Sequence, residues 1–302
     1  MSATQDPEKR PITLRGATGL ALAADAWGDP TAPPVLLLHG GGQTRHAWSG
    51  TGEVLARHGW HAIAMDLRGH GDSEWAPDGD YRHRAFAADT AAVADAFELK
   101  PVLVGASLGG ISSLLALGEV QRAGRPESRG RALVLVDIAS RMEESGARRI
   151  VDFMRQKPDG FESLEEAADA IATYNPHRPK PRNLEGLRKN LRMRDDGRYR
   201  WHWDPAFIEG RFDEYEETED DLHRLDDSAE GLVVPTLLVR GRQSDLLSEE
   251  NARDFLAQAP HAKFVDVTGA GHMVAGDRND KFTSAVVDFL DHDVARATDA
   301  TR

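Results

Sequence analysis

The chain has 302 residues, a formal net charge of −13 and no cysteine. The acidic balance argues against general binding to nucleic acid or to an anionic membrane surface. The lack of cysteine excludes disulfides, thiolate catalysis and cysteine-ligated metals. No stretch approaches the roughly 18 apolar residues that cross a bilayer, and the polar segment 1–15 contains no apolar signal core. We therefore expect a cytoplasmic protein without nucleic-acid or membrane partners.

Short apolar runs alternate with helical patterns in both outer parts of the chain. Residues 12–14 and 20–27 indicate two strands around a glycine turn. The run 35–38, apolar at every position, is typical of a buried parallel strand. Further strands are expected at 61–65, 101–104, 132–136, 235–241 and 263–267, and helices at 51–58, 86–97, 110–117, 251–258 and 280–291. This alternation predicts an α/β fold, with a mostly parallel central sheet flanked by helices.

A long charged segment interrupts the alternation. Residues 139–231 have helical character with several proline breaks. We therefore predict a first core part at 1–138, a helical cap insertion at 139–231 and a second core part at 232–302. Such an insertion is expected over the strand ends, where ligands bind in parallel sheets.

The most informative motif is Gly-Ala-Ser-Leu-Gly at 105–109, which stands between an expected strand and an expected helix. A serine flanked by glycines in this context is typical of a nucleophile elbow. The sharp turn needs small neighbours and exposes the serine, while the helix N-terminus directs its amides at the reaction centre. Ser107 is the predicted nucleophile.

A base and an acid follow later strands. His272 lies in Gly-Ala-Gly-His-Met directly after the last expected strand, and a neutral imidazole there can accept the serine proton near neutral pH. Asp245, just past the preceding strand, is the expected acid that orients the imidazole. Asp137 also ends a strand and is the rival acid.

The glycine-rich run His-Gly-Gly-Gly at 39–42 follows the buried strand at 35–38. Glycines let a backbone approach a substrate closely and point its amides inward. The expected oxyanion donors are the amides of Gly41 and Leu108, with Gly42 as the alternative to Gly41.

The expected pocket is apolar, and no cofactor or metal is expected. No zinc, calcium or phosphate-loop motif is present, and the acidic run 209–230 is interpreted as a solvated helix face. The candidate pocket residues are Trp48, His46, Met273, Trp201 and Trp203, and Phe207 is a further cap aromatic expected to line the pocket.

The order Ser107, Asp245, His272 is the order of the α/β-hydrolases. The sequence resembles that superfamily over residues 12–138 and 232–292. The resemblance includes Asp-Leu-Arg-Gly-His-Gly-Asp-Ser at 66–73, which is similar to the family's D-x-R-G-x-G-x-S turn. In the family this turn is structural and borders the active site, so it implies no catalytic role for Asp66, Arg68 or His70. The resemblance is closest to the capped group of esterases, lactonases, carbon–carbon bond hydrolases, cofactor-free haloperoxidases and epoxide hydrolases.

The resemblance implies a serine hydrolase that cleaves a small-molecule carboxylic ester or lactone through an acyl-enzyme. Ser107 replaces the aspartate that epoxide hydrolases carry at the elbow, which argues against an alkyl-enzyme mechanism. Gly41 stands where cofactor-free perhydrolases tend to have tryptophan or phenylalanine, which disfavours a perhydrolase or haloperoxidase.

Other functions stay open at this stage. Carbon–carbon hydrolysis of a diketone-like substrate would call for arginines that bind a carboxylate, for which Arg141, Arg148 and Arg149 are candidates. A non-catalytic ligand-binding protein with this fold is a third reading. Whether the protein is a monomer or a dimer is left open.

Overall fold

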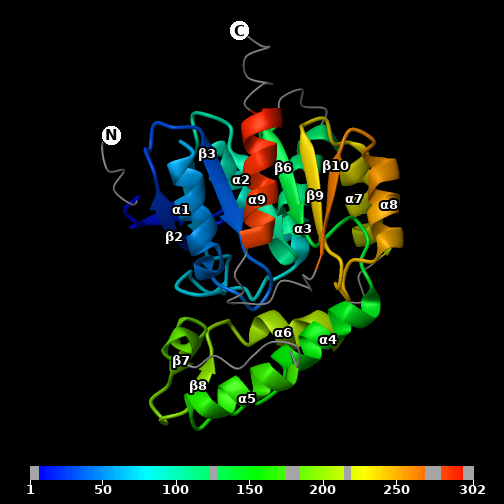
Figure 1. The fold of residues 1–302 in the computed structure, drawn as a ribbon. Coiled ribbons are helices and arrows are strands. Elements are labelled where there is room, and N and C mark those ends of the chain that lie inside the picture. The colour runs from blue at the N-terminus through cyan, green and yellow to red at the C-terminus, as the bar shows by residue number, and fades with distance from the viewer. Residues whose placement is uncertain (1–6, 123–127, 175–183, 214–218, 269–279, 295–302) are drawn as a thin grey trace.

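The computed structural model describes residues 7–122, 128–174, 184–213, 219–268 and 280–294. Within them, an eight-stranded sheet has the order β1-β2-β4-β3-β5-β6-β9-β10 (Figure 1). The strands are β1 (Arg10–Arg15), β2 (Ala21–Trp27), β3 (Pro34–Leu38), β4 (His61–Met65), β5 (Val102–Ala106), β6 (Ala132–Val136), β9 (Thr236–Gly241) and β10 (Lys263–Val267). The pairs β1–β2 and β2–β4 are antiparallel and all other neighbours are parallel. The predicted mostly parallel sheet is confirmed.

Helices cover both faces of this sheet (Figure 1). On one face lie α1 (Ser49–Arg57) and α9 (Asp280–Phe289), and on the other lie α2 (His83–Asp95), α3 (Leu108–Arg122), α7 (Glu219–Glu230) and α8 (Glu249–Gln258). A short 3₁₀ helix at Arg45–Trp48 precedes α1, and a π-helical turn at Leu290–Val294 extends α9. None of the described helices combines the length and apolar character needed to cross a membrane.

The apolar run of β3 is explained by packing on both sides. All five of its residues are buried. Val35 and Leu37 pack in the core under α1 and α9, whereas Leu36 and Leu38 pack in the core under the helices of the opposite face. Because successive side chains of a strand point to opposite faces, a strand covered twice needs apolar residues at every position.

A cap lies across one end of the sheet (Figure 1). Its helices are α4 (Glu144–Met154), α5 (Leu164–Tyr174) and α6 (Ala206–Asp213), with a 3₁₀ helix at Glu185–Lys189. It also contains an antiparallel hairpin of β7 (Leu191–Met193) and β8 (Tyr199–Trp201), which the helical pattern did not predict because three-residue strands are too short to show alternation. Helix α7 falls inside the predicted range 139–231 but packs against α3 of the core.

The order of the strands fixes where a ligand can bind. The strands β3 and β5 are direct neighbours, and the chain leaves β3 toward β4 on one side before it returns to β5 on the other. In open α/β sheets, ligands bind at the carboxyl ends of strands at this kind of topological switch point. The glycine run 39–42 and Ser107 follow β3 and β5 directly, so both lie at this switch point.

A buried ion pair holds the turn 66–73 against α2. Arg68 donates from Nε to Asp89 Oδ2 at 2.7 Å and from Nη2 to Oδ1 at 2.8 Å. Asp89 also accepts from the amide of Ala17 at 2.9 Å. Both charged side chains are almost fully buried, so each depends on the other for compensation.

We predict that Arg68→Met destabilises the protein by about 3–5 kcal/mol, because it leaves the Asp89 carboxylate buried without its partner. Arg253→Ala is the control, since Arg253 forms an exposed ion pair with Glu249 one turn away on α8, and its loss should change stability by less than about 1 kcal/mol. Urea unfolding measures both values. Equal, small effects for the two variants would contradict the prediction.

Candidate active site

Ser107 occupies a sharp turn between β5 and α3, as the sequence predicted. Its φ is +47°, a left-handed conformation that non-glycine residues rarely adopt. A β-carbon on Gly105 would overlap the carbonyl of Gly109, and one on Gly109 would lie 2.5 Å from the carbonyl oxygen of Leu38. The motif therefore needs its two glycines because backbone packs directly on backbone here.

The glycine loop after β3 lies against the elbow. A β-carbon on Gly40 would lie 3.3 Å from Cβ of Ser107, and one on Gly41 would lie 3.9 Å from Cδ2 of Leu108. The amide of Gly109 donates to the carbonyl of His39 at 3.1 Å, which ties the loop to the start of α3.

The amides of this loop have different partners. Gly40 donates to Oε1 of Gln43 at 2.9 Å, and Gly42 donates to Nε2 of His70 at 3.2 Å. No partner is found among the described residues for the amides of Gly41 and Leu108. Of the three predicted oxyanion donors, Gly42 is thus already engaged, whereas Gly41 and Leu108 are available.

The two candidate acids differ in their surroundings. Asp137, which directly follows β6 beside β5, is fully buried and has a φ of +55°. Its carboxylate accepts from the amide of Gly241 at 2.9 Å and from the hydroxyl of Ser244 at 2.6 Å. Asp245 lies on the same loop after β9, with its side chain 40% exposed, and pairs with Arg149 of the cap at 2.6 Å.

Two predicted residues, His272 and Met273, lie outside the described residues. His272 follows β10, whose end at Val267 pairs with Gly241 at the end of β9. The described part of the chain therefore contains the predicted nucleophile, both candidate acids and the predicted oxyanion loop, whereas the predicted base lies outside it. No cluster of three side chains suited to a metal ion is found among the described residues.

Three histidines connect the glycine loop with the turn 66–73. His39 accepts from the amide of Leu67 at 3.0 Å on Nε2 and donates from Nδ1 to the carbonyl of Gly40 at 2.8 Å. His70 accepts from Gly42 on Nε2 and donates from Nδ1 to the carbonyl of Arg68 at 2.9 Å.

The third is His202 of the cap, which accepts from the amide of Gly71 at 2.7 Å on Nδ1 and donates from Nε2 to the carbonyl of Gly42 at 3.2 Å. A backbone amide can only donate and a carbonyl can only accept. Each ring therefore has one nitrogen without a hydrogen and one that carries it, which defines a neutral tautomer. Burial lowers the pKa of His39, and burial together with nearby His39 lowers the pKa of His202 to about 3.

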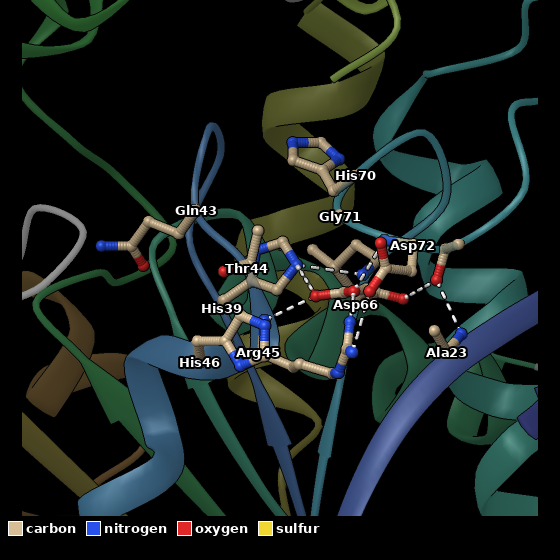
Figure 2. Close-up of polar contacts among 12 residues, drawn as sticks. Ala23, His39, Gln43, Thr44, Arg45, His46, Asp66, His70, Gly71 and Asp72 are labelled. Atoms are coloured by element: carbon tan, nitrogen blue, oxygen red, sulfur yellow. Dashed lines mark hydrogen bonds and ion pairs between the residues drawn. The ribbon is translucent and has the colours of Figure 1, made fainter. Parts of the chain in front are cut away.

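Charged groups fix the other end of the glycine loop. The buried Asp66 accepts from the amides of Arg45 at 2.6 Å and Asp72 at 2.9 Å and pairs with the Arg45 guanidinium. Figure 2 shows Asp66 between His39 and Arg45. Burial opposes the charge on Arg45, but the carboxylates of Asp66, Asp72 and Asp25 outweigh it and raise the pKa of the guanidinium.

The predicted pocket residues separate into two groups. Trp48 packs in the core under α1 and α9, and Nδ1 of His46 lies 3.7 Å from Oδ2 of Asp25. Trp203 lies against the glycine loop: its ring and Met154 would meet a β-carbon on Gly42 at 3.3 and 3.0 Å. Trp201 stacks on Trp203 with 4.9 Å between ring centroids.

Phe207 was among the cap aromatics expected at the pocket, whereas the sequence did not point to Met154, His70 or His202 as residues of this site. Phe207 would lie 3.5 Å from a β-carbon on Gly41. Of the other three, only His70 carried a sequence signal, its place in the 66–73 motif. The others come from the cap, and no pattern in the sequence pairs cap residues with the glycine loop.

The arginines considered for carboxylate binding are engaged by acidic side chains. Arg141 pairs with Asp226, Arg148 with Glu144, and Arg149 with Asp245. All three arginine side chains are more than half exposed. Their contacts give no support to recognition of a substrate carboxylate.

A strained serine at the switch point of a doubly covered sheet, beneath a helical cap, defines an α/β-hydrolase type of protein. A model of the alpha/beta hydrolase fold family matches residues 33–278. The chain belongs to this family and is a hydrolase.

Two curated relatives cover most of the chain. Esterase Rv0045c of Mycobacterium tuberculosis is 31% identical over 268 residues, which are 85% of this chain and 82% of that protein. Its solved structure superposes with a TM-score of 0.71 over 96% of this chain and 93% of that chain at 27% identity. A 3-hydroxybutyrate-oligomer hydrolase of Cupriavidus necator is 29% identical over 264 residues, 83% of this chain and 86% of that protein.

A solved α/β hydrolase from Novosphingobium aromaticivorans is also similar. It has a TM-score of 0.73 at 26% identity and covers 96% of this chain and 99% of its own.

The buried neutral histidines predict acid sensitivity. The unfolded chain binds protons at His202 below its ordinary pKa of 6.5, whereas the folded chain does so only near pH 3. The contribution of His202 to the free energy of unfolding is therefore fully present above pH 6.5. It falls as the pH decreases toward 3, by up to about 1.4 kcal/mol per pH unit. Urea unfolding of wild type and His202→Gln between about pH 6 and pH 4 measures this contribution. The variant should show the shallower slope, and parallel slopes would refute the assignment.

Proposed function

We propose that this chain is a serine esterase that cleaves a carboxylic ester or lactone through an acyl-enzyme. The observation that carries the proposal is the strained Ser107 beside the uncommitted amides of Gly41 and Leu108. A nucleophile and two oxyanion donors at one place are what acyl transfer requires. The relatives named an esterase and a 3-hydroxybutyrate-oligomer hydrolase support the same class of reaction.

In the first step, His272 accepts the hydroxyl proton as Oγ of Ser107 attacks the ester carbon. The carbonyl oxygen becomes an oxyanion that accepts hydrogen bonds from the amides of Gly41 and Leu108. Each such donor is worth about 3 kcal/mol of the barrier. When the tetrahedral intermediate collapses, the carbon–oxygen bond to the alcohol breaks and the alcohol leaves with the proton from His272.

In the second step, water attacks the acyl-enzyme. His272 accepts a proton from the water, a second oxyanion forms at the same two amides, and its collapse returns the proton to Ser107 and releases the acid. An acidic side chain holds the imidazole in the tautomer that accepts the serine proton.

Asp245 is the proposed acid because it follows β9, in the chain order of the family. Arg149 engages Oδ2 of Asp245, and no described residue binds Oδ1. Asp137 remains the rival because it is buried and directly follows the strand beside β5. Its bonds to Gly241 and Ser244 also hold the loop that carries Asp245, so the two residues are mechanically linked.

The walls of the site favour an uncharged, apolar substrate group. Phe207 lies over Gly41, and Met154 and Trp203 lie over Gly42. All three are buried in the core cluster that joins the cap to the sheet. A charged group placed there would lose its hydration without a compensating partner.

The first test is the nucleophile. A fluorophosphonate probe should label wild type at Ser107, and Ser107→Ala should lose labelling and at least about 10³-fold of turnover of p-nitrophenyl acetate, because the covalent step is removed. Peptide mapping and steady-state kinetics give the two readouts. Ser113→Ala is the control, since this buried serine bonds the carbonyl of Gly109 within α3. Unlabelled Ser107 together with full turnover by Ser107→Ala would refute the mechanism and leave a ligand-binding protein as the alternative.

The second test separates the two acids. Asp245→Asn should lower kcat by about 10⁴-fold, as removal of the orienting charge does in serine hydrolases. Asp137→Asn should act mainly on stability through the loop 241–247. Kinetics and thermal unfolding are measured for both. A large loss of kcat in Asp137→Asn at unchanged stability, with an active Asp245→Asn, would assign the acid to Asp137 instead.

A further inference from the structure

The cap segment 201–204, here called the strap, has two different faces. Trp201 and Trp203 stack with an interplanar angle of 12° and belong to the apolar cap interior. His202 and Asp204 point the other way and bond to the turn 66–73 and its surroundings. This alternation has the period of two expected of an extended segment.

The polar face of the strap makes two kinds of contact with the core. Asp204 accepts from the hydroxyl of Tyr81 at 2.5 Å and donates its amide to the carbonyl of Gly69 at 2.9 Å. These bonds attach the cap to the turn and to Tyr81 beyond it, and neither involves the glycine loop. His202 is different, because it bonds to both: it accepts from Gly71 of the turn and donates to Gly42 of the glycine loop.

The bond from His202 completes the fixation of Gly42. Its amide donates to His70 at 3.2 Å and its carbonyl accepts from His202 at 3.2 Å. Gly42 has a φ of +74°, a conformation that glycine adopts readily because it has no β-carbon. The same lack of a side chain leaves its backbone with little steric restriction. Hydrogen bonds on both sides of the residue supply the restriction instead.

The next residue toward the N-terminus is the proposed oxyanion donor. The carbonyl of Gly40 accepts from Nδ1 of His39 at 2.8 Å and from the amide of Gln43 at 3.0 Å. In a planar trans peptide the N–H points opposite to the C=O, so these bonds turn the amide of Gly41 away from His39. The direction of this amide therefore depends on the same short loop that His202 holds at Gly42.

We propose that His202 is a positioning residue through which the cap sets the geometry of the oxyanion loop. His202 is 2% exposed, and its ring lies 5.7 Å from the ring of His70, centroid to centroid. Because the tautomer is fixed by Gly71 and Gly42, the ring acts as a rigid neutral bridge between cap and loop. The inference rests on the proposed esterase function, since a positioned donor matters only if an oxyanion forms there.

Arg192 provides a matched control within the cap. It pairs with Asp72 of the same turn at 2.7 Å and is partly exposed. Arg192→Met removes a contact between the cap and the turn, as a change at His202 does, but leaves the bond to Gly42 in place.

The experiment compares wild type, His202→Phe, His202→Gln and Arg192→Met. His202→Phe keeps a ring without either bond and should lower kcat about 10- to 100-fold with KM changed less than about threefold, because a misplaced donor acts on the transition state. A trifluoromethyl ketone inhibitor, which forms the oxyanion on Ser107, should weaken by the same factor. His202→Gln, which has a donor and an acceptor, should recover most of the loss, and Arg192→Met should stay within about threefold of wild type.

A second readout does not depend on catalysis. Amide hydrogen exchange of a peptide covering residues 39–45 should accelerate in His202→Phe and stay as in wild type in Arg192→Met. Fluorophosphonate labelling of wild type is run alongside: if Ser107 is not labelled, the proposed function fails, while unchanged exchange in folded His202→Phe overturns the positioning role by itself. Equal losses in His202→Phe and Arg192→Met would also overturn it, because cap attachment alone would then explain both. If His202→Phe does not fold, His202→Ala replaces it: faster exchange of residues 39–45 in that folded variant supports the bridge, and unchanged exchange contradicts it.

Discussion

The close approach of two backbones at the carboxyl ends of β3 and β5 is the constraint on which the site depends. Gly109 leaves no space between its Cα and the carbonyl of Leu38, and its amide bonds to the carbonyl of His39. This contact brings the glycine loop beside the elbow and leaves Ser107 in a left-handed conformation at the start of α3. A larger residue at Gly109 would push the end of β3 away from the elbow, and one at Gly105 would collide with the backbone of Gly109 inside the elbow. The same close packing therefore shapes the turn and holds Ser107 beside the loop.

Around that contact, neutral histidines provide the hydrogen-bond partners that regular secondary structure provides for buried backbone elsewhere. The glycine loop and the turn 66–73 are irregular, and their buried amides and carbonyls still need partners. His39, His70 and His202 each satisfy one donor and one acceptor in these segments. A protonated imidazole could not accept from an amide, so burial that keeps the rings neutral is part of how the loops are held. The amide of Gly41 is left over by this pattern, which is why it is available for a substrate.

Much of the core could be predicted because its signals are local. The strands at 61–65, 132–136 and 263–267 agree with the structure to the residue. The first two are short buried runs, and the third mixes charged and apolar residues at the edge of the sheet. The glycines of the elbow and of the loop 39–42 were informative for the same reason: each marks a close approach that only glycine tolerates. The hairpin β7–β8 was missed because its strands are short and their pairing of Leu191 with Trp201 depends on residues ten positions apart.

The sequence by itself determined the order of strands and helices, the place of Ser107 in a strand–turn–helix and the glycines around it, because these follow from periodicity and from the conformations that glycine permits. Only the tertiary structure decided which side chains of the cap reach the site. Met154, Trp203 and His202 meet Gly42 although more than a hundred residues separate them from it, and Trp48, near the loop in sequence, turns into the opposite core. The same holds for the two acids, because burial at Asp137 and the pairing of Asp245 with Arg149 arise from contacts between β6, β9 and α4 that no local pattern encodes.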